Sequence, residues 1–262
     1  MRRFVLLWPL LALISACSTN PVEYQLVWSD EFDGPAGAAP SAENWRYDVG
    51  TDWGNQQLEF DTDRRSNSAL DGAGRLVITA RREDFNGRAF TSARLTTAGK
   101  REFTYGRFEA RMRLPSGQGL WPAFWLLGAD IATVGWPQTG EIDIMEYRGQ
   151  EPNVNHGSLH GPGYSGGRAI TRRYTLPSGT FDTEFHTFRV DWERRQIRFY
   201  VDDVLFHRVN ADDVPGQWVY NHPFYIILNV AVGGTFVGPV GANTTFPQQL
   251  VVDWVRVYQE KN

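Results

Sequence analysis

The chain has 262 residues, of which 26 are basic and 30 are acidic, so its formal net charge is −4. No basic run is longer than a pair, which argues against nucleic-acid binding. A single cysteine excludes an internal disulfide, so the fold depends on its core, and the chain is long enough to bury a substantial one. Aromatic residues make up 14% of the chain and include ten tryptophans, more than a core needs, which favours a stacking surface.

The first residues have the pattern of an export signal. Met1-Arg2-Arg3 supplies the positive start, and the apolar run over 4–14 is too short to span a bilayer. The run ends in Ile14-Ser15-Ala16-Cys17, which resembles the lipobox of bacterial lipoproteins. We therefore expect a signal peptide over 1–16, and the alternative is an ordinary signal cleaved nearby with an incidental cysteine.

The new N-terminus of such a lipoprotein carries the lipid. We expect lipidation at Cys17, a tether over 17–23, and no other membrane contact. Ser18, rather than Asp, follows the cysteine, which by resemblance to bacterial lipoprotein sorting suggests the outer membrane. The predicted location is thus an exported protein anchored at the outer membrane, in the periplasm or at the cell surface.

The remaining chain, 24–262, reads as one all-β domain. Short stretches alternate apolar and polar residues between turn residues, and no stretch has a sustained 3.6-residue period. Many short strands with turns between them imply a sandwich or a barrel. Asp202-Asp203 separates two such stretches as a hairpin turn. We predict strands over 24–28, 75–81, 105–114, 184–192, 196–201, 204–209, 224–230 and 251–258.

Residues 140–149 interleave three acids with large apolar residues, as in a buried strand that carries charge. Alternation places Glu141 and Asp143 on one face, but it places Glu146 on the apolar face, where an unpaired carboxylate costs several kcal/mol. Either the strand ends at Met145, or a β-bulge there absorbs one residue and returns Glu146 to the acidic face. We favour the bulge, because it also places Tyr147 on the apolar face.

Two carboxylates on one face of a strand suit the hydrolysis of glycosidic bonds. A retaining glycosidase needs one nucleophile and one acid/base, with carboxyl groups about 5–5.5 Å apart. The alternative is an edge strand with charges on its solvated face, which predicts neighbouring lysines or arginines. The preceding residues are instead rich in aromatics, as in Trp121-Pro122-Ala123-Phe124-Trp125 and Gly135-Trp136-Pro137.

Glu141-Ile142-Asp143-Ile144-Met145-Glu146 resembles the active-site signature of glycoside hydrolase family 16. The inserted Met is typical of its laminarinase-like endo-β-1,3-glucanases. The resemblance covers about residues 24–258. It implies a β-jelly-roll sandwich of two curved antiparallel sheets with an open concave cleft. Other segments match in the family's order, namely Asp52-Trp53-Gly54-Asn55, residues 105–111, 120–125 and 156–161, and Phe246-Pro247-Gln248-Gln249.

The resemblance also assigns roles to individual residues. It implies that Glu141 is the nucleophile and Glu146 the acid/base, and that Asp143 tunes both. For Glu109 and Arg111, which alternate with apolar residues, it implies a place in the cleft floor, whereas a solvated ion pair is the usual interpretation. The predicted substrate-binding residues are Asn55, Glu109, Arg111, Trp121, Trp125, Trp136, His160 and Asn229.

Each of these binding residues has an ordinary alternative. A lone histidine such as His160 is more often structural. Asn55 is also a turn former. Trp121 and Trp125 are also large core residues, and we expect at least one of the two to lie in the core.

No cofactor is expected for catalysis. The resemblance allows a structural calcium ion held near Glu31, Gly74 and Asp253, largely through backbone oxygens.

The predicted function is hydrolysis of laminarin-like β-1,3-glucan by a monomeric, endo-acting, retaining enzyme whose partner is the polysaccharide. Two alternatives stay open. One is a non-catalytic glucan-binding protein on the same fold. The other is a hydrolase or transglycosylase acting on mixed-linkage glucan, agar or carrageenan.

Overall fold

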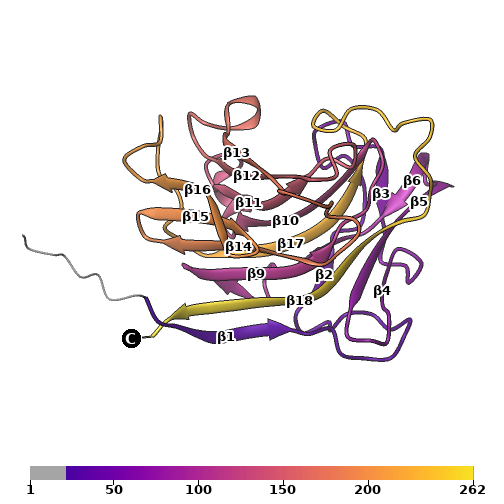
Figure 1. The fold of residues 1–262 in the computed structure, drawn as a ribbon, viewed down its shortest axis with the longest axis horizontal. Coiled ribbons are helices and arrows are strands. Elements are labelled where there is room, and N and C mark those ends of the chain that lie inside the picture. Colours follow the sequence, from indigo (N-terminus) through magenta and orange to yellow (C-terminus); the bar gives the residue numbers. More distant parts are fainter. Residues whose placement is uncertain (1–21, 262) are drawn as a thin grey trace, which may run out of the picture.

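The computed structural model describes residues 22–261, which form a sandwich of two β-sheets (Figure 1). The predicted signal peptide and Cys17 therefore lie outside the described residues. None of the helices within 22–261 is long and apolar enough to cross a membrane. The two helical elements are short, α1 (Ile131–Val134) and a 3₁₀ turn over Gly166–Arg168, so the all-β prediction is confirmed.

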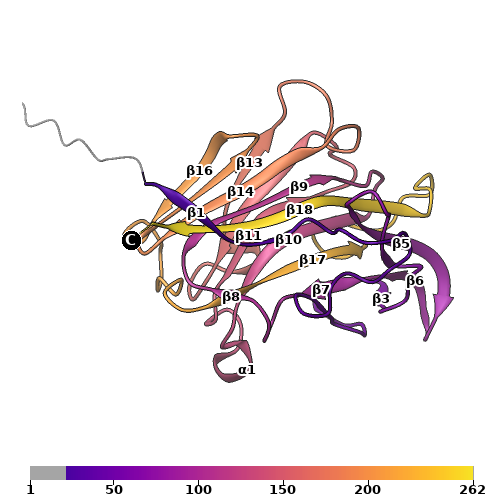
Figure 2. The same cartoon turned by 90° about the horizontal axis from the view of Figure 1, so that it is seen from below.

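The larger sheet has ten strands, in the order β16-β15-β14-β9-β18-β5-β6-β3, with β1 beside β18 and β4 beside β5. Figures 1 and 2 show β1 and β18 lying side by side across the molecule. Its strands are β1 (Tyr24–Asp30), β3 (Glu59–Asp61), β4 (Ser68–Leu70), β5 (Leu76–Phe85), β6 (Arg88–Ser92), β9 (Gly106–Arg113), β14 (His186–Glu193), β15 (Gln196–Val201), β16 (Val204–Asn210) and β18 (Gln248–Glu260).

The smaller sheet has eight strands, in the order β13-β12-β11-β10-β17-β7-β2, with β8 beside β17. All pairings in the two sheets are antiparallel except that between β3 and β6. Its strands are β2 (Arg46–Tyr47), β7 (Arg94–Thr96), β8 (Glu102–Phe103), β10 (Leu120–Gly128), β11 (Glu141–Tyr147), β12 (Val154–His160), β13 (Ile170–Thr175) and β17 (Phe224–Val232).

All eight predicted strands are present, most with slightly different ends. The strand over 196–201 has its predicted bounds, and the strand over 251–258 extends to Gln248–Glu260. Asp202 and Asp203 both have positive φ, 48° and 65°, as a two-residue hairpin of type I′ requires. The hairpin prediction is therefore confirmed.

One large core fills the space between the sheets. Along each central strand, alternate side chains point into this core and away from it. In β17, Phe224, Ile226 and Leu228 belong to this core, while Ile227 and Asn229 belong to the opposite face. We call the face of the eight-stranded sheet that turns away from the core the site face. The acidic positions of β11 belong to it.

Candidate active site

The register of β11 contains the predicted bulge. In the pairing of β11 with β10, Phe124 lies opposite Met145 and Trp125 lies opposite Asp143. Ile144 therefore has no partner and is an extra residue in β11. The pairing with β12 shifts at the same place. Consecutive residues Ile144 and Met145 are both fully buried in the core. The bulge therefore lets Glu146 share the site face with Asp143, which confirms the prediction.

Two indole groups donate hydrogen bonds to the glutamates of β11. Trp121 Nε1 donates to Glu146 Oε1 over 3.0 Å. Trp136 Nε1 donates to Glu141 Oε2 over 3.1 Å. Each glutamate therefore has one oxygen held by a neutral donor, while the other oxygen stays available for chemistry.

His160 stands beside the other end of this acidic row, on the neighbouring strand β12. Its Nε2 lies 3.1 Å from Asp143 Oδ2 and 3.6 Å from Glu141 Oε1. The backbone N–H of Gly166 donates to the opposite ring nitrogen, Nδ1, over 3.1 Å. In neutral imidazole the proton is then on Nε2, which faces Asp143 Oδ2, although the two atoms do not form a hydrogen bond of good geometry.

Burial changes the protonation of all three acids. It raises the pKa of Asp143 to about 8, and a hydrogen bond with Glu141 opposes this shift. Burial, followed by the negative charge of Asp143, raises the pKa of Glu141 and that of Glu146 to about 8 as well. Groups coupled this closely titrate as a set. The site can therefore hold a carboxylate and a carboxylic acid together at neutral pH, as acid/base chemistry requires.

The predicted tryptophans all lie beside the acids. Trp121 and Trp125 both belong to the site face of β10. Trp121 is buried there in a small hydrophobic cluster with Ala231 and Val237, so the expectation that one of the two is a core residue is confirmed, although this cluster is separate from the main core. Trp125 Nε1 donates to Asn229 Oδ1 over 2.9 Å, which brings that predicted asparagine into the site. Trp136, 46% exposed, stands at the rim.

Asn55 lies next to the site in a tight turn. Its φ is 53°, and its carbonyl oxygen accepts the N–H of Thr235 over 2.8 Å. A Cβ atom added to Gly234 would lie 2.8 Å from this same oxygen and 3.5 Å from the Trp121 ring. The turn-former alternative is therefore confirmed, and the turn places the exposed side chain of Asn55 near Trp121.

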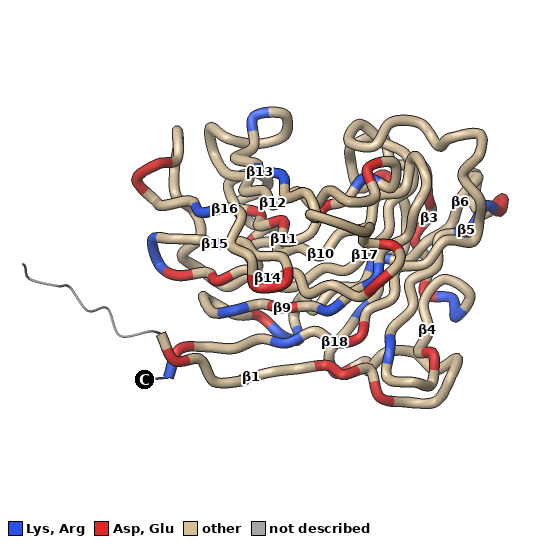
Figure 3. The backbone as a smooth tube through the Cα atoms, in the orientation of Figure 1, with Lys and Arg blue, Asp and Glu red and all other residues tan. Residues whose placement is uncertain are grey.

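The prediction that Glu109 and Arg111 belong to the cleft floor is wrong. Their strand, β9, lies between β14 and β18 in the other sheet, and their apolar neighbours enter the core, so both lie on the outer face of that sheet, opposite the site face. Figure 3 shows the alternating charges along β9. Glu109 pairs with Arg107 and Arg189, and Arg111 Nη1 lies 2.5 Å from Asp253 Oδ2. The ion-pair interpretation therefore holds.

The residues predicted to hold calcium are close together, but their carboxylates have other partners. Glu31 forms two 2.9 Å hydrogen bonds with Arg256, and Asp253 pairs with Arg75 as well as Arg111. A Cβ atom added to Gly74 would lie 3.7 Å from the Glu31 carbonyl oxygen. The arginines neutralise both carboxylates, so a calcium ion here would depend on backbone oxygens, and the predicted site stays a prediction.

Sequence reasoning missed an aromatic and charged cluster at the β7 side of the site. The Arg94 guanidinium lies over the rings of Trp53 and Trp125, 5.1 and 4.9 Å from their centroids. Its Nε donates to Asp48 Oδ2 over 3.2 Å. Arg94 alternates with a buried leucine in a strand of three residues, which is too short to recognise by periodicity.

Three further buried titratable groups lie on strands β3 and β12, next to this cluster and the acids. Burial raises the pKa of Glu59 to about 7, and burial together with the charge of Glu59 raises the pKa of Asp61 well above its usual range. Glu59 accepts the N–H of Val232 over 2.7 Å, which ties β3 to the end of β17. Burial also lowers the pKa of His156, which pairs with Glu146 across the strands, to about 4.

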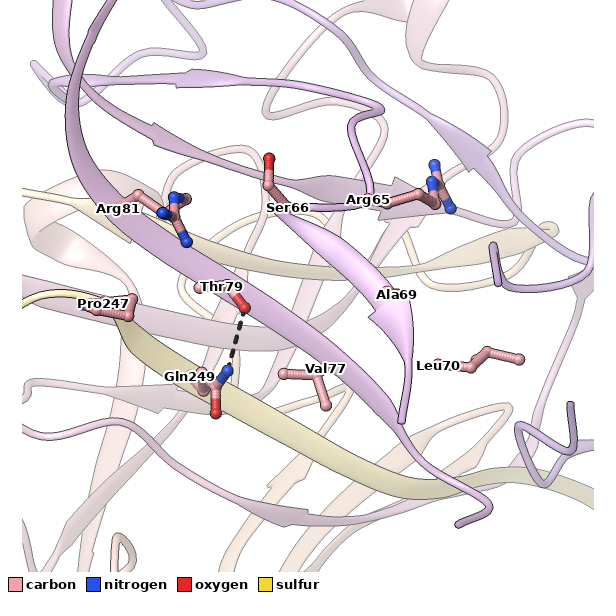
Figure 4. A pocket seen from close by; sticks show the side chains of 9 residues that line it. All are labelled: Arg65, Ser66, Ala69, Leu70, Val77, Thr79, Arg81, Pro247 and Gln249. Carbon is pink, nitrogen blue, oxygen red and sulfur yellow. Dashed lines mark hydrogen bonds between the residues drawn. The ribbon is translucent and has the colours of Figure 1, made fainter. Parts of the chain in front are cut away.

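A hollow away from the acids lies on the outer face of the ten-stranded sheet, over β4, β5 and β18 (Figure 4). Its volume is about 280 Å³. Thr79 and Gln249 meet across it through a 3.5 Å hydrogen bond, and Arg65 and Arg81 are among its lining residues. The lining contains no acidic residue and no aromatic ring. It therefore lacks the groups that glycosidic chemistry needs.

Known proteins resemble the whole sandwich. A β-glucanase from Rhodothermus marinus is 45% identical over 253 residues, which cover 92% of this chain and 87% of that protein. A glucan endo-1,3-β-glucosidase from Cryptopygus antarcticus is 38% identical, over 86% of this chain and 87% of that protein. The X-ray structure of an endo-β-1,3-glucanase from Pyrococcus furiosus matches with a TM-score of 0.87 at 45% identity, over 93% of this chain and 97% of that one.

The family model described as glycosyl hydrolases family 16 matches residues 45–256. This range includes the bulged strand β11 with its three acids and both strands that flank it. The resemblance inferred from the signature in residues 141–146 is therefore confirmed. The chain belongs to the glycosyl hydrolases family 16.

Proposed function

We propose that the protein is an endo-acting β-1,3-glucanase that cleaves laminarin-like polysaccharide with retention of anomeric configuration. The observation that carries this proposal is the bulge in β11, which puts Glu141, Asp143 and Glu146 on one face. The names of the relatives support the substrate, since two of them are endo-1,3-β-glucanases.

In this mechanism Glu141 attacks the anomeric carbon while protonated Glu146 gives its proton to the leaving oxygen. A covalent glycosyl-enzyme forms and the aglycone departs. Glu146, now ionised, then takes a proton from water, whose oxygen displaces Glu141 from the anomeric carbon. Trp136 and Trp121 each hold one oxygen of these glutamates, which orients the two carboxyl groups.

Asp143 acts between the two glutamates and reacts with neither. Its Oδ2 lies 3.1 Å from His160 Nε2, and a hydrogen bond with Glu141 opposes the rise in its pKa. Its charge keeps the proton on Glu146 before the first step, because a second negative charge nearby disfavours ionisation. Metal ions have no part in this scheme.

Sugar binding is assigned to the aromatic rings and to Asn229 beside the acids. Trp125 and Trp136 offer ring faces to sugars, and Arg94 beside Trp125 offers guanidinium donors for hydroxyl groups. A glucan-binding protein without activity needs the rings but not the acids. The intact set of Glu141, Asp143 and Glu146 therefore favours the enzyme.

The substrate assignment is tested with purified protein on laminarin, lichenan, agarose and carrageenan, by measuring new reducing ends. We expect laminarin to be cleaved fastest, with products of mixed length early in the reaction, as an endo-acting enzyme gives. Faster cleavage of agarose or carrageenan would contradict the proposed substrate but would not affect the proposed mechanism. Binding of laminarin without any cleavage would favour the glucan-binding alternative.

We expect Asp143→Asn to move the pH profile of kcat/KM toward lower pH. The charge of Asp143 raises the pKa of Glu141 and of Glu146, second only to burial, so its removal lowers both. The alkaline limb, where Glu146 loses its proton, and the acid limb, where Glu141 gains one, then both move down by about one pH unit. Glu109→Gln, on the other sheet, is the control. An unmoved profile would show that Asp143 does not tune the pair.

Three further features remain predictions. Lipidation at Cys17 is checked by mass spectrometry of the exported protein, and the monomer by its mass in solution. Calcium binding is checked by calorimetric titration, with Asp253→Asn as the comparison. The ion pairs of Glu31 and Asp253 argue for weak binding at most.

A further inference from the structure

The loop between β10 and β11, residues 129–140, brings Trp136 to the site. The indole N–H of Trp136 donates to Glu141 Oε2 over 3.1 Å, and its ring lies 5.8 Å from that of His160. Figure 2 shows α1, which belongs to this loop, standing out from the sandwich. The loop therefore sets the position of a donor on the proposed nucleophile.

The loop has little apolar packing of its own to hold that position. No residue of α1 (Ile131–Val134) is buried, and of the loop residues only Ala129 and Ile131 pack, in part, against the apolar cluster around Leu127. Trp136 itself is 46% exposed. Other interactions must therefore hold the loop in place.

Such interactions occur at the base of the loop. Thr139 Oγ1 donates to Asp130 Oδ1 over 2.6 Å, and His222 Nε2 lies 3.0 Å from the same oxygen. His222 belongs to the segment before β17, so Asp130 brings together the two ends of the loop and a third part of the chain. A Cβ atom added to Gly128 would lie 2.2 Å from Thr139 Oγ1 and 2.7 Å from His222 Nε2, so the three groups are closely packed over this glycine.

The direction of the Asp130 side chain is itself informative. Asp130 occupies the N-cap position of α1, where an aspartate ordinarily accepts a hydrogen bond from the first helical N–H groups. It makes no such bond, and its carboxylate turns across the loop toward Thr139 and His222. The Asp130 carboxylate therefore does not cap α1 and instead bonds with Thr139 at the other end of the loop.

We propose that Asp130, Thr139 and His222 form a clasp that positions Trp136 against Glu141. These are positioning residues, because their side chains contact one another and not the three acids. The role in catalysis rests on the proposed function of Glu141, whereas the effect on the position of Trp136 does not. Through the clasp, the position of the donor to the nucleophile depends on a hydrogen bond at the base of its loop.

The first experiment compares Thr139→Val, which removes only the donor, with Thr139→Ser, which keeps it. On laminarin we expect kcat/KM to fall about tenfold in Thr139→Val, the factor that one hydrogen bond of about 1.4 kcal/mol represents, and to stay within about twofold of wild type in Thr139→Ser. In a Trp136→Ala background, Thr139→Val should cause no further loss. An equal loss in both backgrounds would overturn the clasp, because it would show that Thr139 affects activity independently of Trp136.

The second experiment does not need activity. In protein labelled with ¹⁵N-tryptophan, the indole resonance of Trp136 is identified by its absence in Trp136→Phe. We expect Thr139→Val to shift this resonance and speed its exchange with water. An unchanged resonance overturns the clasp. If wild type cleaves no glucan but the resonance still moves, the proposed function fails and the clasp stands.

The matched control is the His186–Asp202 pair, whose Nδ1 and Oδ2 lie 2.6 Å apart on the other sheet. Asp202→Ala should leave both the Trp136 resonance and kcat/KM unchanged. Should Thr139→Val fail to fold, Asp130→Ala makes the same comparison, because the Asp130 side chain is 41% exposed and its removal leaves no cavity. A response to Asp202→Ala as large as that to Asp130→Ala would overturn the proposal.

Discussion

Replacing Glu141 with Gly should abolish hydrolysis of β-1,3-glucan and leave a protein that joins sugars. Without the nucleophile no glycosyl-enzyme can form, so turnover of laminarin falls to background. An α-glycosyl fluoride has the anomeric configuration of that intermediate and fits the space that the carboxylate vacates. With a glucan acceptor, Glu146 deprotonates the attacking hydroxyl, fluoride leaves, and a β-linkage forms. Mass spectrometry of the products measures the new bonds.

Glu146→Gln distinguishes the two roles. It keeps the nucleophile and loses the proton donor, so laminarin hydrolysis should drop by about 10²–10⁴-fold, and no synthesis from the fluoride is expected. A substrate with an acidic phenol as leaving group should still be cleaved in the first step, because that leaving group needs no proton. Glu109→Gln, a carboxylate on the other sheet, should keep wild-type activity. Synthesis by the Glu146 variant instead would reverse the assignment.

An alanine inserted between Met145 and Glu146 should inactivate the protein, whereas deletion of Met145 should leave measurable turnover. The strand already contains one extra residue at Ile144 relative to both neighbours. A second cannot be absorbed by a single-residue bulge, so it would turn Glu146 into the core at a cost of several kcal/mol, or out of reach. Deletion removes the bulge, and simple alternation then keeps all three acids on one face.

Deletion of Met145 also lowers the stability of the core, and a control variant measures this effect separately. Met145 is fully buried, so its loss removes core volume and costs about 2–5 kcal/mol, the range for a large-to-small change. Met145→Leu keeps the bulge and nearly the same volume, and it should cost less than about 1.5 kcal/mol. Laminarin turnover is measured for all three variants, with circular dichroism to establish sheet content. A folded but inactive deletion, together with an active insertion, would show that the bulge does not position Glu146.

The sequence by itself determined the strands and the local shape of the catalytic strand. Alternation is a property of neighbouring residues, so it identified β15 within its bounds and the hairpin at Asp202-Asp203. The bulge at Ile144 also followed from local information, because the cost of burying Glu146 outweighs the cost of one irregular residue. The identity of the three acids depended on nothing beyond residues 140–149 and their resemblance to the family.

Only the tertiary structure decided which sheet each strand joins and what lies across the site. Alternation gives every strand two faces but does not say which face of which sheet forms the cleft. The resemblance therefore implied a cleft position for Glu109, although the pairing of β9 with β14 and β18 puts it on the opposite side of the molecule. The stack of Arg94 with Trp53, and the contact of Asp130 with His222, depend in the same way on segments far apart in the chain. Such contacts form only when the sheets pack, because their geometry is set by long-range pairing rather than by the residues next to them in sequence.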